Sequence, residues 1–229
     1  TGHICVNSNR KSYSWQRVNC SYEKGLYMRI ERVESLDKRK CKVFTDEDFA
    51  FLLYNGELEK YGVCEGAVLE ERTERELLDL LSRRAHERAL NLLKVQDRTE
   101  GEMCRRLFQD GYPDSIVQET IGFLQEYHFV DDARYAANYL QVHGKRKSQA
   151  ELKLYLQRKG ISREIIREQL EETEHDSGEA IRVLLEKKHY RAGETAPEEK
   201  KKIIAYLMRR GFLWEDIRRE MKEQEDALG

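Results

Sequence analysis

Cysteine, histidine and paired acidic side chains are the residues of this chain that could bind a metal or catalyse a reaction. The five cysteines are widely spaced and form no C-x-x-C pair, and the six histidines form no H-E-x-x-H motif. Asp131-Asp132 resembles a metal-binding pair, but it stands where a helix should begin, and N-capping explains it more simply. We therefore expect no catalytic residues, no metal site and no cofactor.

Lysine and arginine side chains are the other group with a clear chemical use, because a cluster of them binds phosphates or acidic surfaces. The chain has 41 basic and 43 acidic side chains, so only a local patch could do this. Residues 133–170 hold 9 basic and 3 acidic side chains, residues 89–131 hold 4 and 8, and residues 198–229 hold 8 of each. The candidates for contact with a partner or with DNA are Lys145, Arg146, Lys147, Lys153, Arg158, Lys159, Arg163 and Arg167. An ordinary solvated helical surface is the alternative explanation.

Composition limits the class of fold that presents these side chains. Charged residues make up 37% of the chain, hydrophobic residues 39%, and only 2 of the 229 residues are proline. This mixture favours long helices around a core and excludes a membrane protein or a fully disordered chain. No apolar stretch approaches ~18 residues, no signal-peptide pattern is visible, and the cysteines suggest no disulfide framework. We therefore expect a reducing, cytoplasmic location.

Residues 26–72 have the pattern of a small β-sheet. Side chains alternate in polarity over residues 27–34, and short apolar runs follow at residues 41–45 and 49–54, separated by charged turns. The spacing predicts a three-stranded meander. Residues 1–25 are polar without a periodic pattern, so we expect a flexible lead-in. A long helix is predicted over residues 73–96, starting at the capping box Thr73-x-x-Glu76.

The helical part of the chain repeats itself. Gly111, Gly160 and Gly211 are 49 and 51 residues apart, and each has a leucine four positions earlier and an apolar residue one position later. A glycine fits the helix C′ position, where φ is positive and a residue with a side chain is disfavoured. The apolar residue that follows packs back on the leucine in a Schellman motif. We predict positive φ at all three glycines.

The starts of the same helices also match. Thr99-x-x-Glu102 and Ser148-x-x-Glu151 are capping boxes at equal distances from their glycines, whereas Thr195-x-x-Glu198 would start the third helix about one turn earlier. Each unit has another apolar-periodic stretch before this helix and a short helix after its glycine. The pattern predicts helix–helix–glycine–helix modules of about 50 residues. Stacked helical modules commonly form binding surfaces rather than active sites.

These patterns predict a mainly α protein, an elongated array of three tandem three-helix repeats with a small N-terminal β meander. The expected segments are the lead-in at residues 1–25, the β-rich segment at 26–72, the first repeat with its long leading helix at 73–131, the second, basic repeat at 132–178 and the third repeat at 179–229.

Several of the same motifs resemble those of the RecX family of bacterial recombination regulators. Arg98-Thr99-Glu100-x-Glu102 with Leu107-x-x-x-Gly111 is similar to the opening of the family's first repeat, and Phe129–Ala136 to its join with the second. Glu151–Ile161 and Gly211-Phe212-x-x-x-Asp216-Ile217 look like parts of the second and third repeats. The resemblance also reaches the predicted meander through Glu57-Leu58 and Glu65-Gly66-x-x-Leu69, so it covers about residues 26–225. Gly101, inside the first turn of a helix, departs from good helix-forming sequence.

The resemblance implies a curved array of three-helix units and a partner, the RecA recombinase filament on single-stranded DNA. Proteins of this family bind that filament and mainly inhibit strand exchange and the SOS response, and they have no known catalytic site. The resemblance supplies no fixed set of binding residues. Together with the basic second repeat it predicts a monomer that contacts RecA, and single- or double-stranded DNA, without a membrane or a cofactor.

Two other functions stay open at this point. A helix, a glycine turn and a second helix also resemble a helix-turn-helix unit, so a stand-alone helical DNA-binding regulator is the main alternative. Base-specific contact would require a recognition helix with Arg, Asn or Gln side chains that reach the bases. A general protein-interaction scaffold is the third possibility.

Overall fold

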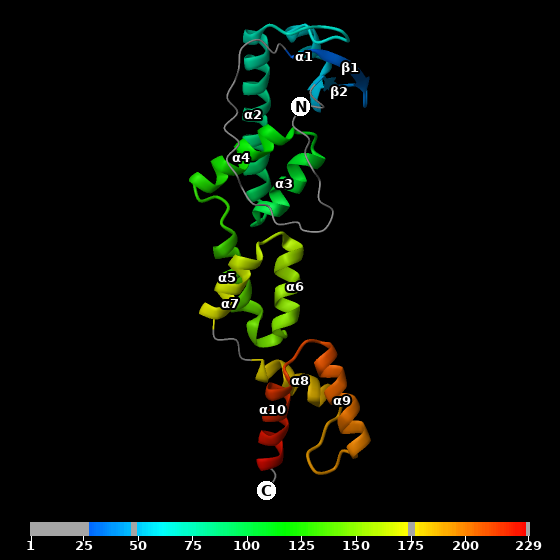
Figure 1. Ribbon diagram of the computed structural model, residues 1–229, viewed down its shortest axis with the longest axis vertical. Helices are drawn as coiled ribbons and strands as arrows, with labels where there is room; N and C mark the ends of the chain where they lie inside the picture. Colours follow the sequence, from blue (N-terminus) through cyan, green and yellow to red (C-terminus); the bar gives the residue numbers. More distant parts are fainter. Residues whose placement is uncertain (1–27, 47–49, 174–176, 228–229) are drawn as a thin grey trace. The chain divides into compact units, whose positions relative to one another are not determined.

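The computed structural model describes residues 28–46, 50–173 and 177–227. The described residues fall into two compact units that divide between Leu77 and Leu78. They form ten α-helices and one three-stranded sheet, which confirms the mainly α class (Figure 1). The lead-in predicted at residues 1–25 lies outside the described residues. None of the described helices combines the length and the apolar character that crossing a membrane requires.

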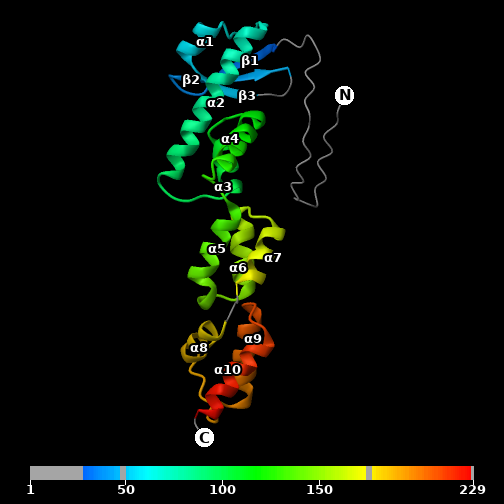
Figure 2. The same cartoon turned by 90° about the vertical axis from the view of Figure 1, so that its left-hand side faces the viewer.

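The first unit contains the predicted meander. Strands β1 (Ile30–Ser35), β2 (Lys40–Thr45) and β3 (Ala50–Tyr54) pair antiparallel in the order β1-β2-β3, and Figure 2 shows them side by side. Val43 lies opposite Phe51, and both are fully buried, as the alternation of side chains across a strand requires. Helix α1 (Asn55–Tyr61) follows β3 directly.

Helix α2 (Glu71–Leu93) begins in the first unit and continues into the second. The start predicted at Thr73 is wrong. Helical hydrogen bonding is already present there, because the amide of Glu74 donates to the carbonyl of Glu70 at 2.9 Å. Thr73 therefore lies within the first turn and does not cap it.

The second unit contains three groups of helices, each with its own buried apolar cluster. The first repeat consists of the end of α2, α3 (Glu100–Gln109) and α4 (Asp114–Glu126). The second consists of α5 (Asp132–His143), the short 3-10 helix η1 (Gly144–Arg146), α6 (Gln149–Lys159) and α7 (Arg163–Glu172). The third consists of α8 (Gly178–Lys187), α9 (Pro197–Arg209) and α10 (Trp214–Asp226). Leu107, Leu156 and Leu207 are fully buried in the three clusters.

The three predicted C′ glycines are confirmed. Gly111, Gly160 and Gly211 have φ of 85°, 98° and 86°. The residue after each glycine donates its amide to the carbonyl of the matching leucine at 3.2 Å, which is the hydrogen bond of a Schellman motif. The conformation of the glycine therefore ends α3, α6 and α9 in the same way.

Two of the three predicted helix starts are confirmed. Thr99 and Ser148 cap α3 and α6, and both capping boxes are complete. The third helix does begin about one turn earlier relative to its glycine, but the predicted cap at Thr195 is wrong, because the N-cap of α9 is Ala196 and Pro197 is its first residue. The Thr195 hydroxyl instead accepts a hydrogen bond from the Arg191 amide at 2.8 Å, within the preceding loop. Proline suits the first helical position because a backbone N–H there would make no hydrogen bond within the helix, so its absence costs nothing.

Candidate partner-binding surface

The eight basic candidates lie on η1, directly after it, on α6 and on α7, all within the second repeat. Lys147 and Lys159 are partly buried. The exposed candidates are Lys145, Arg146, Lys153, Arg158, Arg163 and Arg167. The second repeat therefore presents six of the eight positive charges to solvent. The other two, Lys147 and Lys159, are engaged in contacts with neighbouring side chains.

Lys147 lies against a pair of stacked tyrosines. The rings of Tyr139 on α5 and Tyr155 on α6 are parallel to within 5°, with centroids 4.0 Å apart. The Lys147 ammonium donates to the Tyr139 hydroxyl at 2.5 Å and lies 5.0 and 5.4 Å from the two ring centroids. Cation–π contact and the hydrogen bond hold this lysine in place. The sequence analysis did not identify either tyrosine as a site residue, because the two meet only when α5 and α6 face each other in the fold.

Two titratable groups, His143 and Tyr135, lie near Lys147 and the stacked tyrosines and are uncharged. Burial lowers the pKa of His143, and the nearby charges of Lys147 and Arg146 lower it further, so the imidazole is neutral at neutral pH. Burial raises the pKa of Tyr135 to about 12, assisted by a hydrogen bond with Tyr155. The positive charge beside the stacked tyrosines therefore comes from lysine and arginine side chains and not from His143.

Lys159 belongs to a junction between the first and second repeats. The Thr99 hydroxyl, which caps α3, donates to the Lys159 carbonyl at 2.6 Å. The Lys159 ammonium pairs with Glu102, the other member of the capping box, at 2.6 Å. Burial works against the charged lysine, but the hydrogen bond with Glu102 outweighs it and raises the pKa of Lys159. The start of α3 is thus joined to the end of α6.

The second and third repeats meet through the same set of contacts. The Ser148 hydroxyl caps α6 and donates to the Arg210 carbonyl at 2.6 Å. The Arg210 guanidinium reaches Glu151 of the capping box with two nitrogens, at 2.7 and 3.1 Å. Each junction therefore combines a hydroxyl, a capping glutamate and the basic residue before a C′ glycine.

The glycines allow the backbones to approach at these junctions. A Cβ on Gly101 would lie 2.9 Å from the Gly160 Cα, which is closer than real Cβ contacts. A Cβ on Gly211 would lie 2.3 Å from the Ala150 Cβ. Gly101, which looks unfavourable as a helical residue, is explained by this approach. Gly160 and Gly211, which end α6 and α9, thus also make room for the preceding repeat.

The Asp131-Asp132 pair has the capping role that the sequence suggests, but at two different helices. Asp131 caps α5 and accepts from the Arg134 amide at 2.9 Å. Asp132 is buried, and its carboxylate accepts from the Glu100 amide at 2.9 Å, at the start of α3. Among the described residues no group of three His, Cys, Asp or Glu side chains could hold a metal ion.

Asp132 should make stability depend on pH. Burial raises the pKa of Asp132 to about 6, although the hydrogen bond from the Glu100 amide lowers it. The folded state then binds a proton more tightly than the unfolded state, so this group's contribution to the unfolding free energy falls as pH rises from about 4 to 6. Asp132→Asn keeps an oxygen acceptor without ionising.

We therefore expect Asp132→Asn to be more stable than the parent above pH 6, by about 1–3 kcal/mol, because one pKa unit is worth ~1.4 kcal/mol. The contact of the carboxylate with the start of α3 offsets part of the cost of burying its charge. The two proteins should converge below about pH 4. Urea unfolding at pH 4, 6 and 8 measures this difference. A constant difference across the series would show that Asp132 does not titrate in this range.

The comparisons with known proteins follow the same three groups of helices. The first three-helix domain of RecX matches residues 85–124, the second matches residues 131–170 and the third matches residues 176–221. The three matches occur in the order of the repeats and together cover more than half of the chain. This chain belongs to the RecX family. The resemblance seen in its capping and core motifs is thereby confirmed.

Related proteins are similar to this chain over different lengths. The regulatory protein RecX of Clostridium tetani is 34% identical over 135 residues, which cover 57% of this chain and 62% of that protein. The chain thus spans less than two thirds of that relative. The regulatory protein RecX of Clostridium acetobutylicum is 27% identical over 203 residues, or 85% of this chain and 95% of that protein.

Solved structures of RecX share the fold. One crystal structure of regulatory protein RecX has a TM-score of 0.59 and 21% identity, and covers 85% of this chain and 99% of that one. The structure of RecX from Lactobacillus salivarius has a TM-score of 0.55 and 22% identity, and covers 64% of this chain and 97% of that one. At these identities the likeness concerns the fold alone.

Proposed function

We propose that this protein binds the RecA recombinase filament on single-stranded DNA in the cytoplasm and mainly inhibits strand exchange and the SOS response. The observation that carries the proposal is the exposed positive charge of the second repeat, in a chain of the RecX family. A filament on DNA presents phosphates, and exposed lysines and arginines bind phosphates and release their counterions. Occupation of the filament surface would compete with incoming duplex DNA or with addition of recombinase subunits.

The exposed basic residues can be tested without disturbing the cluster around the stacked tyrosines. Lys145→Glu with Arg146→Glu reverses two exposed charges on η1 and leaves Lys147 in contact with Tyr139. Lys201→Glu with Lys202→Glu reverses two exposed charges on α9 and is the matched control. We expect the first pair to weaken filament binding about tenfold or more at low salt, to flatten its salt dependence and to abolish inhibition of strand exchange.

Circular dichroism and thermal unfolding show whether both variants are folded. A folded Lys145→Glu, Arg146→Glu variant that inhibits strand exchange like the parent would place the contact on another repeat. Equal losses for both pairs would mean that charge in general, and not the second repeat, determines binding.

A stand-alone DNA-binding regulator is the second candidate, and the stacked Tyr139 and Tyr155 favour it. Aromatic rings beside lysines are a common platform for single-stranded nucleic acid, because bases stack on the rings and the cations meet the backbone. Binding of the parent to the RecA filament and to the same DNA without RecA distinguishes the two. Equal affinity for both would favour this candidate.

A further inference from the structure

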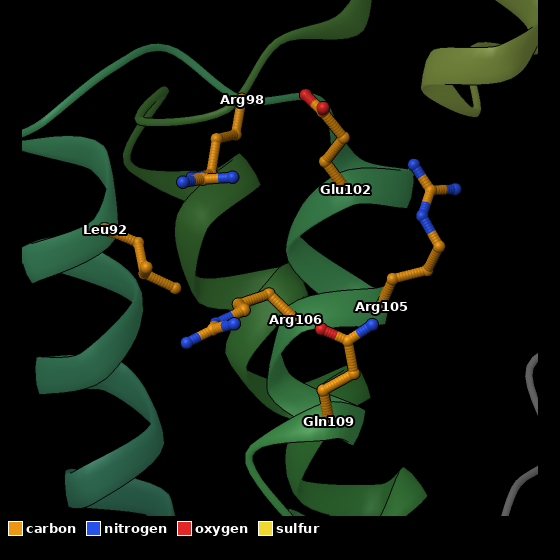
Figure 3. A pocket seen from close by; sticks show the side chains of 6 residues that line it. All are labelled: Leu92, Arg98, Glu102, Arg105, Arg106 and Gln109. Atoms are coloured by element: carbon orange, nitrogen blue, oxygen red, sulfur yellow. The ribbon is translucent and has the colours of Figure 1, made fainter.

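A pocket of about 480 Å³ lies in the first repeat, between the end of α2 and α3 (Figure 3). Its lining residues are Leu92, Arg98, Glu102, Arg105, Arg106 and Gln109. Residues 89–131 contain only four basic side chains against eight acidic ones, and three of the four line this pocket. The positive charge of an otherwise acidic repeat is thus concentrated at one site.

The carboxylates near the pocket already have partners. Glu102 pairs with Lys159 at 2.6 Å. Asp110 pairs with Arg88 at 2.6 Å and lies farther from Arg106, at 3.5 Å. In Figure 3 the guanidinium groups of Arg98 and Arg106 turn toward the space beside Leu92, whereas the Glu102 carboxylate and the Arg105 guanidinium point away from it. The pocket therefore keeps a positive charge that no neighbouring carboxylate fully compensates.

Arg98 is half-buried and has no hydrogen-bond or ion-pair partner among the described residues, and its Nε is fully enclosed. An enclosed N–H without an acceptor costs free energy, so such a group in a folded protein requires an explanation. An oxyanion in the pocket that accepts hydrogen bonds from the terminal nitrogens of Arg98 and Arg106 would give the Arg98 guanidinium an acceptor.

We propose that this pocket binds one carboxylate of a protein partner, an Asp or Glu side chain with basic residues beside it. An arginine fork matches a carboxylate, and Leu92 gives an apolar wall for the methylene groups that carry it. The acidic surroundings repel a chain of phosphates and attract basic flanking side chains. The choice of partner rests on the proposed function, under which the carboxylate belongs to the protein surface of the filament.

The direct test uses the nitrogen-15 NMR signal of the Arg98 Nε–H, which its enclosure protects from exchange with water. The signal is assigned with Arg98→Lys. The full chain is titrated with acetyl-Lys-Glu-Lys-amide, with acetyl-Lys-Gln-Lys-amide and with oligothymidylate. We expect a saturable shift with the glutamate peptide alone, and its loss in Arg106→Gln. No shift with the glutamate peptide, or an equal shift with oligothymidylate, would overturn the proposal.

The second test asks whether the pocket serves filament binding. Arg98→Lys with Arg106→Gln should weaken binding to the RecA filament about tenfold and leave affinity for bare single-stranded DNA unchanged. Lys94→Gln is the matched control, because Lys94 is the fourth basic residue of this segment, is exposed and lies outside the pocket. Equal losses of affinity for the filament and for bare DNA would mean that the pocket binds phosphate, and would refute the proposal that it binds a carboxylate. A parent that binds no filament refutes the proposed function, and the peptide titration still decides the pocket.

Discussion

Replacement of Ser148 by alanine should lower the free energy of unfolding by about 2–4 kcal/mol, more than a lost helix cap alone explains. The Ser148 hydroxyl accepts from the Glu151 amide at 3.2 Å and donates to the Arg210 carbonyl at 2.6 Å, and the residue is fully buried. Alanine removes the cap of α6, which is worth about 1 kcal/mol, and leaves a part-buried carbonyl of the next repeat without its donor.

Ser162 provides the matched control for this prediction. It caps α7 by accepting from the Ile165 amide at 3.2 Å, and it is exposed. Ser162→Ala should therefore cost only about 1 kcal/mol. Urea unfolding of both variants gives the two free energies, and amide hydrogen exchange near Gly211 shows whether the junction has opened. Equal costs would mean that the hydrogen bond to Arg210 does not stabilise the junction.

Gly211→Ala should cost about 3 kcal/mol or more, because two penalties coincide at this residue. Its φ of 86° is unfavourable for alanine by about 1–2 kcal/mol. The new Cβ would also lie 2.3 Å from the Ala150 Cβ, so the junction must shift, and overpacking of this kind costs about 1–3 kcal/mol.

Gly193 separates the two penalties. It has φ of 75°, and a Cβ there would meet nothing within 4 Å, so Gly193→Ala reports backbone strain alone. Ala150→Gly removes the atom that Gly211→Ala would strike. In a double-mutant cycle of these two changes we expect a favourable coupling of about 1–3 kcal/mol. A coupling near zero in thermal and urea unfolding would show that the junction accepts the extra methyl group by moving at little cost.

The local features of the fold were predictable because a few adjacent residues determine each of them. A glycine with positive φ, a capping box and a leucine on one helix face all lie within one helix and its ends, and the structure confirms them in α3 and α6. The errors at Thr73 and Thr195 have a common cause. In a chain with 37% charged residues, a Thr followed three positions later by Glu occurs often without capping a helix.

The charged surface was harder to predict from the sequence. The excess of basic residues in the second repeat is visible in the sequence, and six of them are exposed. Lys159 serves a junction because Glu102 lies beside it, although the two are 57 residues apart in the chain. Arg98 and Arg106 were not among the predicted binding residues because the charge of the first repeat, summed over its length, is negative. Their shared pocket exists only once α3 packs beside α2.

By itself, then, the sequence determined the helical repeats, their caps and glycine ends, and the family to which the chain belongs, since these depend on spacings of three or four residues within one helix. Only the tertiary structure decided that the capping residues Thr99 and Ser148 also join one repeat to the next. Their second hydrogen bonds reach carbonyls 60 and 62 residues away. The apolar clusters lie within single repeats, so the polar contacts of caps, carbonyls and ion pairs join the repeats, and such pairs form only when the chain has folded.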